Sequence, residues 1–204
     1  MASVHSEGMW VRSEYASELA VLSAWIAVLL PWNVAYQPNA PPDGQASIYF
    51  FRFALFEIQF RRPWVVEVNG EVTEFVEPLD ITHGGTQLFG NIYARLPTSA
   101  ATFYDGTMGQ ASLLWTLAAL AFAVAFALSL GLYVREDAVA AKLPVSEVRL
   151  MGGLLAVGAV GTVGASALYL TARDSTGVPF PVGALVVAVL AVVLLRTEEV
   201  DPDG

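Results

Sequence analysis

Four long runs of apolar residues, separated by polar segments, dominate the pattern of the chain. None of the four contains Asp, Glu, Lys, Arg or His between its limits. A helix of about 18 or more uncharged residues is long enough to cross a hydrocarbon core of roughly 30 Å. The last run only just reaches this number of residues. The pattern therefore predicts four membrane-spanning helices, at residues 19–36, 111–134, 150–172 and 178–195.

The segments outside these runs differ in length and composition. By far the longest is residues 37–110, which mixes polar and aromatic residues. The others are an N-terminal segment at 1–18, a link at 135–149, a turn at 173–177 and an acidic tail at 196–204, of which residues 197–204 are expected to be disordered. This organisation predicts a membrane anchor that carries one sizeable domain outside the bilayer.

The distribution of Lys and Arg predicts the orientation of the chain, because these residues are enriched in short cytoplasmic loops. The link contains three basic residues, Arg135, Lys142 and Arg149, whereas Arg173 is the only basic residue of the turn. We therefore expect the link and both termini to be cytoplasmic and residues 37–110 to be extracytoplasmic.

Alternating apolar and polar residues predict β-structure in the long outer segment. Residues 48–60 alternate with a period of two, and the phase slips by one position between Leu55 and Phe56. This pattern is typical of one strand that carries a β-bulge. A helix lying in the membrane interface is the alternative, although a 3.6-residue period fits the Phe and Ile positions poorly.

A β-hairpin is predicted around Asn69-Gly70, because this dipeptide suits the positive φ angles of a type I′ turn. A two-residue turn pairs Val68 with Glu71 and places Trp64 opposite Phe75. Since one hairpin is only marginally stable, we expect it to join residues 48–60 in a small antiparallel sheet. A further strand is expected at 88–96 and loops at 83–86 and 97–109. The predicted hairpin and surface residues of this outer domain are Trp64, Asn69, Gly70 and Phe75.

Small residues in the second and third runs predict close helix packing. Residues at a spacing of four in the second run form a ladder that consists of Ala119, Ala123, Ala127 and Gly131. The third run is rich in glycine, including Gly158 and Gly161. Small side chains let helix backbones approach closely in lipid, so we expect the two helices to pack together. The alternative is that alanine is simply common in this composition.

The charge balance of the 204-residue chain limits its environment and partners. There are 19 Asp and Glu against 10 Lys and Arg, a net charge of −9, and Lys142 is the only lysine. An acidic, lysine-poor surface suits concentrated salt, where charge repulsion is screened within about 3 Å, so we expect a halophilic archaeal origin. The lack of a basic cluster argues against nucleic acid as a partner. There is no cysteine, which excludes disulfides and thiolate chemistry.

No combination of residues predicts a catalytic, metal or cofactor site. Ionisable residues inside a membrane usually mark ion or proton paths, so their absence from the four runs argues against a pump, a proton-coupled carrier or an intramembrane protease. His5 and His83 are isolated histidines. The acidic residues between Glu67 and Asp80 favour a solvated surface over a cation site, which needs oxygens converging from a shaped loop.

The layout of the chain resembles the claudin-like tetraspan membrane proteins. Leu30-Pro31-Trp32-Asn33-Val34, which leaves the first run, looks like the Trp-containing entry into the claudin outer sheet. The chain differs from that family in lacking its two loop cysteines and its Gly-Leu-Trp motif. The resemblance implies lateral association and outer-surface contacts rather than chemistry. In composition the chain also resembles small membrane proteins of halophilic archaea.

Together these observations predict a helical membrane protein with a four-helix transmembrane bundle and a small extracytoplasmic antiparallel β-subdomain. We expect it to be a non-enzymatic interaction or scaffold protein without cofactors. Its expected partners are the lipid bilayer and other membrane proteins or itself, bound through the outer β-subdomain. The alternatives are an accessory subunit of a larger respiratory, transport or envelope complex, and a pore formed by oligomerisation.

Overall fold

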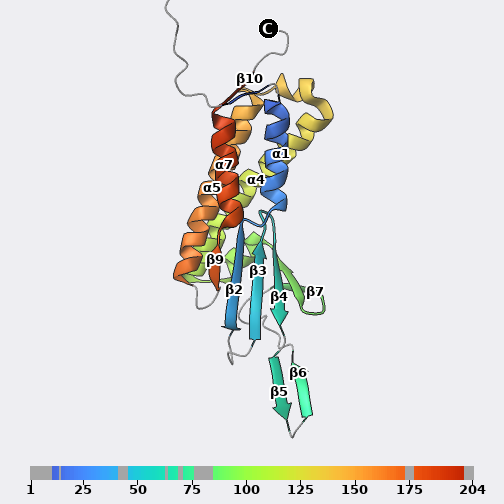
Figure 1. The fold of residues 1–204 in the computed structure, drawn as a ribbon, viewed down its shortest axis with the longest axis vertical. Coiled ribbons are helices and arrows are strands. Elements are labelled where there is room, and N and C mark those ends of the chain that lie inside the picture. Colours follow the sequence, from blue (N-terminus) through green and yellow to red (C-terminus); the bar gives the residue numbers. More distant parts are fainter. Residues whose placement is uncertain are drawn as a thin grey trace, which may run out of the picture.

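The long helices occupy one end of the molecule and most of the strands the other (Figure 1). The structure is a computed structural model, which describes residues 11–13, 15–40, 46–62, 64–68, 71–75, 85–172 and 177–199. The helices are α1 (Ala16–Leu29), α3 (Pro97–Phe103), α4 (Gly106–Ala140), α5 (Glu147–Thr171) and α7 (Val182–Leu195). Helix α4 packs against α1 and α5, and α5 packs against α7. The predicted combination of a helix bundle with an antiparallel sheet is therefore confirmed.

Two helices are shorter than the predicted runs because proline residues lie at their limits. One proline follows the end of α1, and another precedes the start of α7. In the first run, α1 stops at Leu29 and Leu30 is extended, as expected for a residue that precedes Pro31. The prediction that the helix continues to residue 36 is wrong, because the chain from Asn33 is a strand. In the last run, residues 178–180 also form a strand, and α7 begins after Pro181.

Two of the described helices are long and apolar enough to cross a membrane by length and composition, namely Gly106–Arg135 and Glu147–Thr171. Helices α1 and α7 are apolar but have 14 residues each, about 21 Å at ~1.5 Å per residue. The Ser146 hydroxyl caps α5 by accepting a hydrogen bond from the Arg149 amide at 3.4 Å.

Six strands form the main sheet, and all pair antiparallel in the order β7-β8-β4-β3-β2-β9. Their bounds are β2 Asn33–Ala40, β3 Ala46–Arg52, β4 Glu57–Arg62, β7 Thr86–Phe89, β8 Ile92–Arg95 and β9 Val178–Phe180. The strands labelled in Figure 1 continue the long axis of the helix bundle. Strand β9 brings the segment before α7 into the same sheet as the long outer segment.

The single bulged strand predicted at residues 48–60 is wrong. The chain reverses between β3 and β4, and the tip is closed by a hydrogen bond from the Phe53 amide to the Phe56 carbonyl at 2.8 Å. The slip in the alternation therefore marks a hairpin turn rather than a bulge. The strand predicted at 88–96 is likewise a hairpin, β7–β8, and the loop predicted at 97–109 contains α3 and the start of α4.

The hairpin predicted around Asn69-Gly70 has the expected register. Strand β5 (Trp64–Val68) pairs with β6 (Glu71–Phe75), with Trp64 opposite Phe75 and Val68 opposite Glu71. The expectation that it joins the main sheet is wrong, since β5 and β6 form a separate two-stranded sheet. Residues 69–70 lie outside the described residues.

The first and last described strands pair at the helical end of the molecule (Figure 1). Strand β1 (Val11–Ser13) pairs in parallel with β10 (Thr197–Glu199). The expectation that the whole tail from residue 197 is disordered is therefore wrong for its first three residues, because they gain a backbone partner from the N-terminal segment.

Candidate functional site

The main sheet has one buried face, in which polar and charged side chains lie beside apolar ones such as Ile48 and Phe50. Its row nearest the helices runs across four strands and consists of Asn33, Arg52, Glu57 and Arg95, which are successive cross-strand partners. Their exposed fractions are 0%, 0%, 0% and 4%. Charged side chains are almost never fully buried unless they are paired, so this row requires internal partners.

Glu57 is the centre of these contacts. Its Oε1 accepts a hydrogen bond from Arg95 Nη2 at 2.7 Å, and its Oε2 lies 2.7 Å from Arg52 Nε. Gln59 Nε2 donates to Oε1 at 2.6 Å. The Arg61 guanidinium in turn donates to Gln59 Oε1 at 3.0 and 2.8 Å. One carboxylate thus holds two arginines directly, and Gln59 connects a third to it.

The same network joins the sheet to the helices. Arg52 Nη1 donates to Asn33 Oδ1 at 2.9 Å, and Asn33 Nδ2 donates to Ser166 Oγ of α5 at 3.2 Å. The Arg52 guanidinium also lies over the Tyr169 ring of α5, 4.3 Å from its centroid. A change of sheet position relative to α5 would therefore break buried hydrogen bonds, which leaves costly unpaired groups.

Two tryptophans hold the tip of the β3–β4 hairpin against the bundle. The indole N–H groups of Trp32 and Trp115 each donate to the Phe53 carbonyl at 3.0 Å, and Trp115 also donates to Ala54 at 3.1 Å. Both tryptophans are buried, and their ring centroids are 6.0 Å apart. Since a buried indole N–H needs a partner, these bonds fix the hairpin tip to α4.

The pKa of Glu57 reports the balance of forces in this network. Burial alone would raise the pKa of its carboxyl group, but attraction by Arg95 and Arg52 and hydrogen bonds from Gln59 and Arg52 outweigh burial. The pKa therefore lies below the ordinary value of 4.5. The ionised form is the one that the folded sheet stabilises.

Acid should destabilise the sheet through this group. Because the folded pKa of Glu57 is lowered, its contribution is complete above about pH 4.5 and is lost as the pH falls through the folded pKa. We expect the melting temperature of the purified protein to fall in this acid range by more in the unaltered chain than in Glu57→Gln, which lacks the titrating group. Parallel pH profiles for the two proteins would contradict this assignment.

The opposite face of the main sheet is apolar and open. Two rows of cross-strand partners cross all six strands on this face. The row nearer the helices contains Phe180, Val34, Phe51, Ile58, Ala94 and Thr86, and the next row contains Val178, Tyr36, Tyr49, Phe60, Ile92 and Phe89. We call these twelve residues the aromatic face. Its most exposed large side chains are Phe89, Phe180, Val178, Tyr36 and Phe60, with exposed fractions of 69%, 57%, 45%, 41% and 41%.

A shallow hollow of about 490 Å³ lies at the centre of the aromatic face. Its lining combines four of the face residues with arginine side chains and comprises Tyr49, Phe51, Phe60, Ile92, Arg61, Arg62 and Asn91. The Phe51 and Phe60 rings meet edge to face at 5.5 Å. Contiguous exposed apolar patches usually mark protein or membrane contacts, and a hollow in such a patch can receive an anchoring side chain.

A family model matches residues 9–199, which is nearly the whole chain. The chain belongs to the family of unknown function DUF7549. No curated protein matches the chain. Family membership therefore assigns no activity, and the chemistry of the site has to be inferred from the residues themselves.

The residues predicted to pack the helices together do not all lie on one contact surface of the protein. On α5, Gly158 faces the Phe122 ring, and Gly161 faces Ala118 and the Leu114 carbonyl of α4. On α4, Ala119 is buried, Ala123 is half-buried and Ala127 is exposed, while Gly131 lies next to Val139 beyond a kink at Arg135. The ladder is therefore not one contact face within the chain. A step of four residues turns ~400° around a helix, so such a ladder drifts by about 40° per step.

The predicted outer surface residues and the aromatic face are different sets. The backbones of Trp64 and Phe75 lie on β5 and β6, whereas their side chains and Asn69-Gly70 lie outside what the structure describes. The alternation in residues 48–60 was the available signal for the aromatic face. It separates the two faces correctly but does not say which one is buried.

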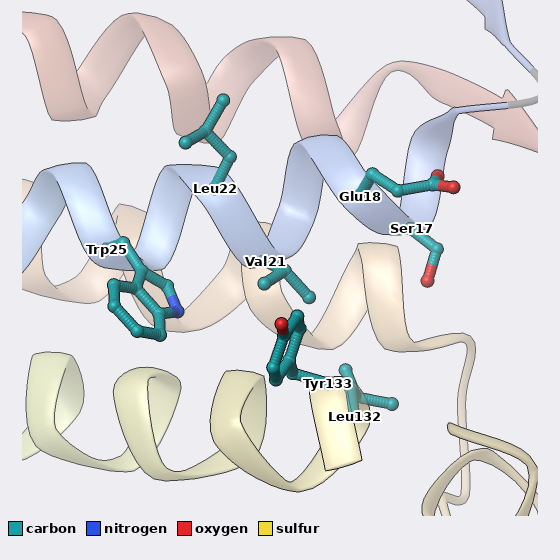
Figure 2. Close-up of a pocket in the computed structure, with 7 residues that line it drawn as sticks. All are labelled: Ser17, Glu18, Val21, Leu22, Trp25, Leu132 and Tyr133. Carbon is teal, nitrogen blue, oxygen red and sulfur yellow. The ribbon is translucent and has the colours of Figure 1, made fainter. Parts of the chain in front are cut away.

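A second hollow, of about 520 Å³, lies between α1 and α4 (Figure 2). Its lining is mostly apolar and comprises Ser17, Glu18, Val21, Leu22, Trp25, Leu132 and Tyr133. Glu18 is the only carboxylate in this lining. Among the described residues, no group of three or more His, Asp or Glu side chains is placed to hold a metal ion. The hollow therefore suits a hydrocarbon chain better than a polar substrate.

Proposed function

We propose that the chain is a non-enzymatic integral membrane protein with four membrane-crossing helices, whose outer sheet binds a protein partner through the aromatic face. The bundle is supported by apolar side chains that are more than half exposed on each of its four helices. They include Leu22 and Leu29 of α1, Leu113, Leu117, Leu120 and Val124 of α4, Val157 and Val160 of α5, and Leu185 and Val189 of α7. A water-soluble protein rarely exposes so large an apolar surface.

The two short helices fit this arrangement because they pack along the two long ones. Helix α1 contacts α4 and α5, and α7 contacts α5. A helix shorter than the hydrocarbon core is accommodated by local thinning of the bilayer at modest cost. The arginine and lysine residues of the 135–149 link favour the cytoplasm, which supports an outer position for the main sheet.

The observation that carries the recognition role is the exposed aromatic face of the main sheet. The polar network buries charged side chains whose desolvation is costly, and the aromatic side chains of the same strands remain exposed. Aromatic residues are enriched where proteins bind one another. A protein partner would cover this contiguous apolar surface, which a protein without a partner rarely exposes.

An accessory subunit of a larger membrane complex is the second candidate. Exposed apolar residues continue from the aromatic face onto the helices, since Leu29 ends α1 just before β2 and Val182 begins α7 just after β9. Their exposed fractions are 66% and 58%. This continuity favours a partner that is itself embedded in the membrane.

Replacing Phe60 by Asp tests the recognition role. A charge at the centre of the aromatic face should reduce partner recovery from native membranes at least tenfold, which corresponds to about 1.4 kcal/mol of binding free energy. The matched control is Phe103→Asp on α3, because Phe103 and Phe60 are both 41% exposed. The measurement is the amount of protein that co-purifies from membranes solubilised in a mild detergent. Equal recovery for both variants would remove the aromatic face from the proposal.

A further inference from the structure

We infer that the partner on the aromatic face is a second copy of the same chain, packed sheet against sheet about a two-fold axis parallel to the strands. This inference rests on the proposed recognition role of that face. It follows from three properties of the face, which are its direction, its charge and its extent.

The direction of the strands permits such a pair in one membrane. Two copies inserted with the same orientation can be related only by an axis along the membrane normal. The strands of the main sheet continue the long axis of the helix bundle (Figure 1), so this normal is also the strand direction. A rotation of 180° about an axis in front of the aromatic face then turns two copies of that face toward each other. A two-fold contact uses the same surface on both subunits.

The charge of the aromatic face favours an identical partner. The chain carries a net charge of −9, so most contacts between two copies would oppose like charges. The twelve residues of the aromatic face include no carboxylate, and the charged side chains that line its hollow are Arg61 and Arg62. Two copies can therefore meet here without opposing carboxylates.

The area of the aromatic face is smaller than the area that a stable dimer usually buries. Six strands at about 4.8 Å spacing and two rows of side chains give on the order of 400 Å². A standard interface buries about 800 Å² per partner. The exposed ends of α1 and α7 adjoin β2 and β9 in the chain, and in a membrane pair they supply the remaining contact. A soluble partner would lack this second part.

The strand order fixes which residues meet. In the order β7-β8-β4-β3-β2-β9, the axis passes between β4 and β3, so Phe60 lies near its own equivalent. The outer strands exchange places, so β7 of one copy lies opposite β9 of the other. Phe89 and Val178 belong to the same row and are therefore brought together between copies, although they lie at opposite edges of one sheet.

Cross-linking in native membranes tests this arrangement because the chain has no cysteine. Facing sheets are about 10 Å apart, beyond the reach of a disulfide, so the probe is a short bismaleimide. Phe60→Cys should give a covalent dimer. A chain with Phe89→Cys co-expressed with a chain with Val178→Cys should also give a dimer, whereas each alone should give at least fivefold less. Phe103→Cys on α3 is the control and should remain monomeric.

The outcomes separate this inference from the proposed function. Dimers from Phe60→Cys and from the mixed edge pair support a second copy in the stated geometry. Absence of both dimers overturns the second copy, and the proposed function still holds if Phe60→Asp loses a different co-purifying protein. Absence of both dimers together with unchanged recovery in Phe60→Asp overturns both. If Phe89→Cys alone gives as much covalent dimer as the mixed pair, the two-fold geometry is overturned.

Discussion

Replacing Glu57 by Gln is expected to destabilise the folded protein by about 3–5 kcal/mol, the usual cost of removing one partner of a buried ion pair. The carboxylate is fully buried and lies 2.7 Å from both Arg52 and Arg95. Glutamine keeps the shape but not the charge, so two guanidinium groups remain buried without a counter-charge from this position. The measurement is the free energy of unfolding of the purified protein in detergent.

Glu18→Gln is the control for the Glu57 change. Glu18 is exposed in the first turn of α1, where a carboxylate near a helix start contributes about 1 kcal/mol or less. The substitution is chemically the same, and only the surroundings differ. A loss below about 1 kcal/mol for Glu57→Gln would show that Arg52 and Arg95 find other counter-charges, and that Glu57 is not the centre of the network.

Local signals in the sequence were sufficient for elements that local interactions determine. The register of β5 and β6 follows from Asn69-Gly70, because a two-residue turn leaves one pairing of the flanking residues. Ser146 predicts the start of α5 because a hydroxyl there satisfies a free backbone amide. Neither feature depends on distant parts of the chain.

Which face of the main sheet is buried could not be predicted in this way. Alternation in β3 and β4 has the same form whichever face is buried. The choice depends on Ser166, Tyr169 and Trp115, which approach from helices more than 50 residues away in the sequence. An expectation that apolar residues are buried does not select a face here, since Phe50 is buried beside Arg52 whereas Phe60 is exposed.

The contact face of α4 shows a similar limit. Its buried residues recur at steps of three and four and include Ala111, Trp115, Ala118, Phe122 and Ala125. The large Phe122 ring fits in this set because the facing position on α5 is Gly158. Counting small residues on one helix misses such a combination of large and small partners on two helices.

Replacing a glycine of α5 by alanine is the second change expected to have a large effect on stability, and another glycine of the same helix provides the control. Alanine is a better helix former than glycine by about 1 kcal/mol. A methyl group added at Gly158 would overlap the buried Phe122 ring, whereas one added at Gly153 meets nothing within 4 Å. We expect Gly158→Ala to lower the free energy of unfolding by about 1–3 kcal/mol, the usual cost of overpacking. Gly153→Ala should leave it unchanged or raise it by up to about 1 kcal/mol. Equal shifts of either sign in detergent unfolding curves would mean that helix propensity, rather than the contact of α5 with α4, decides which residue each position accepts.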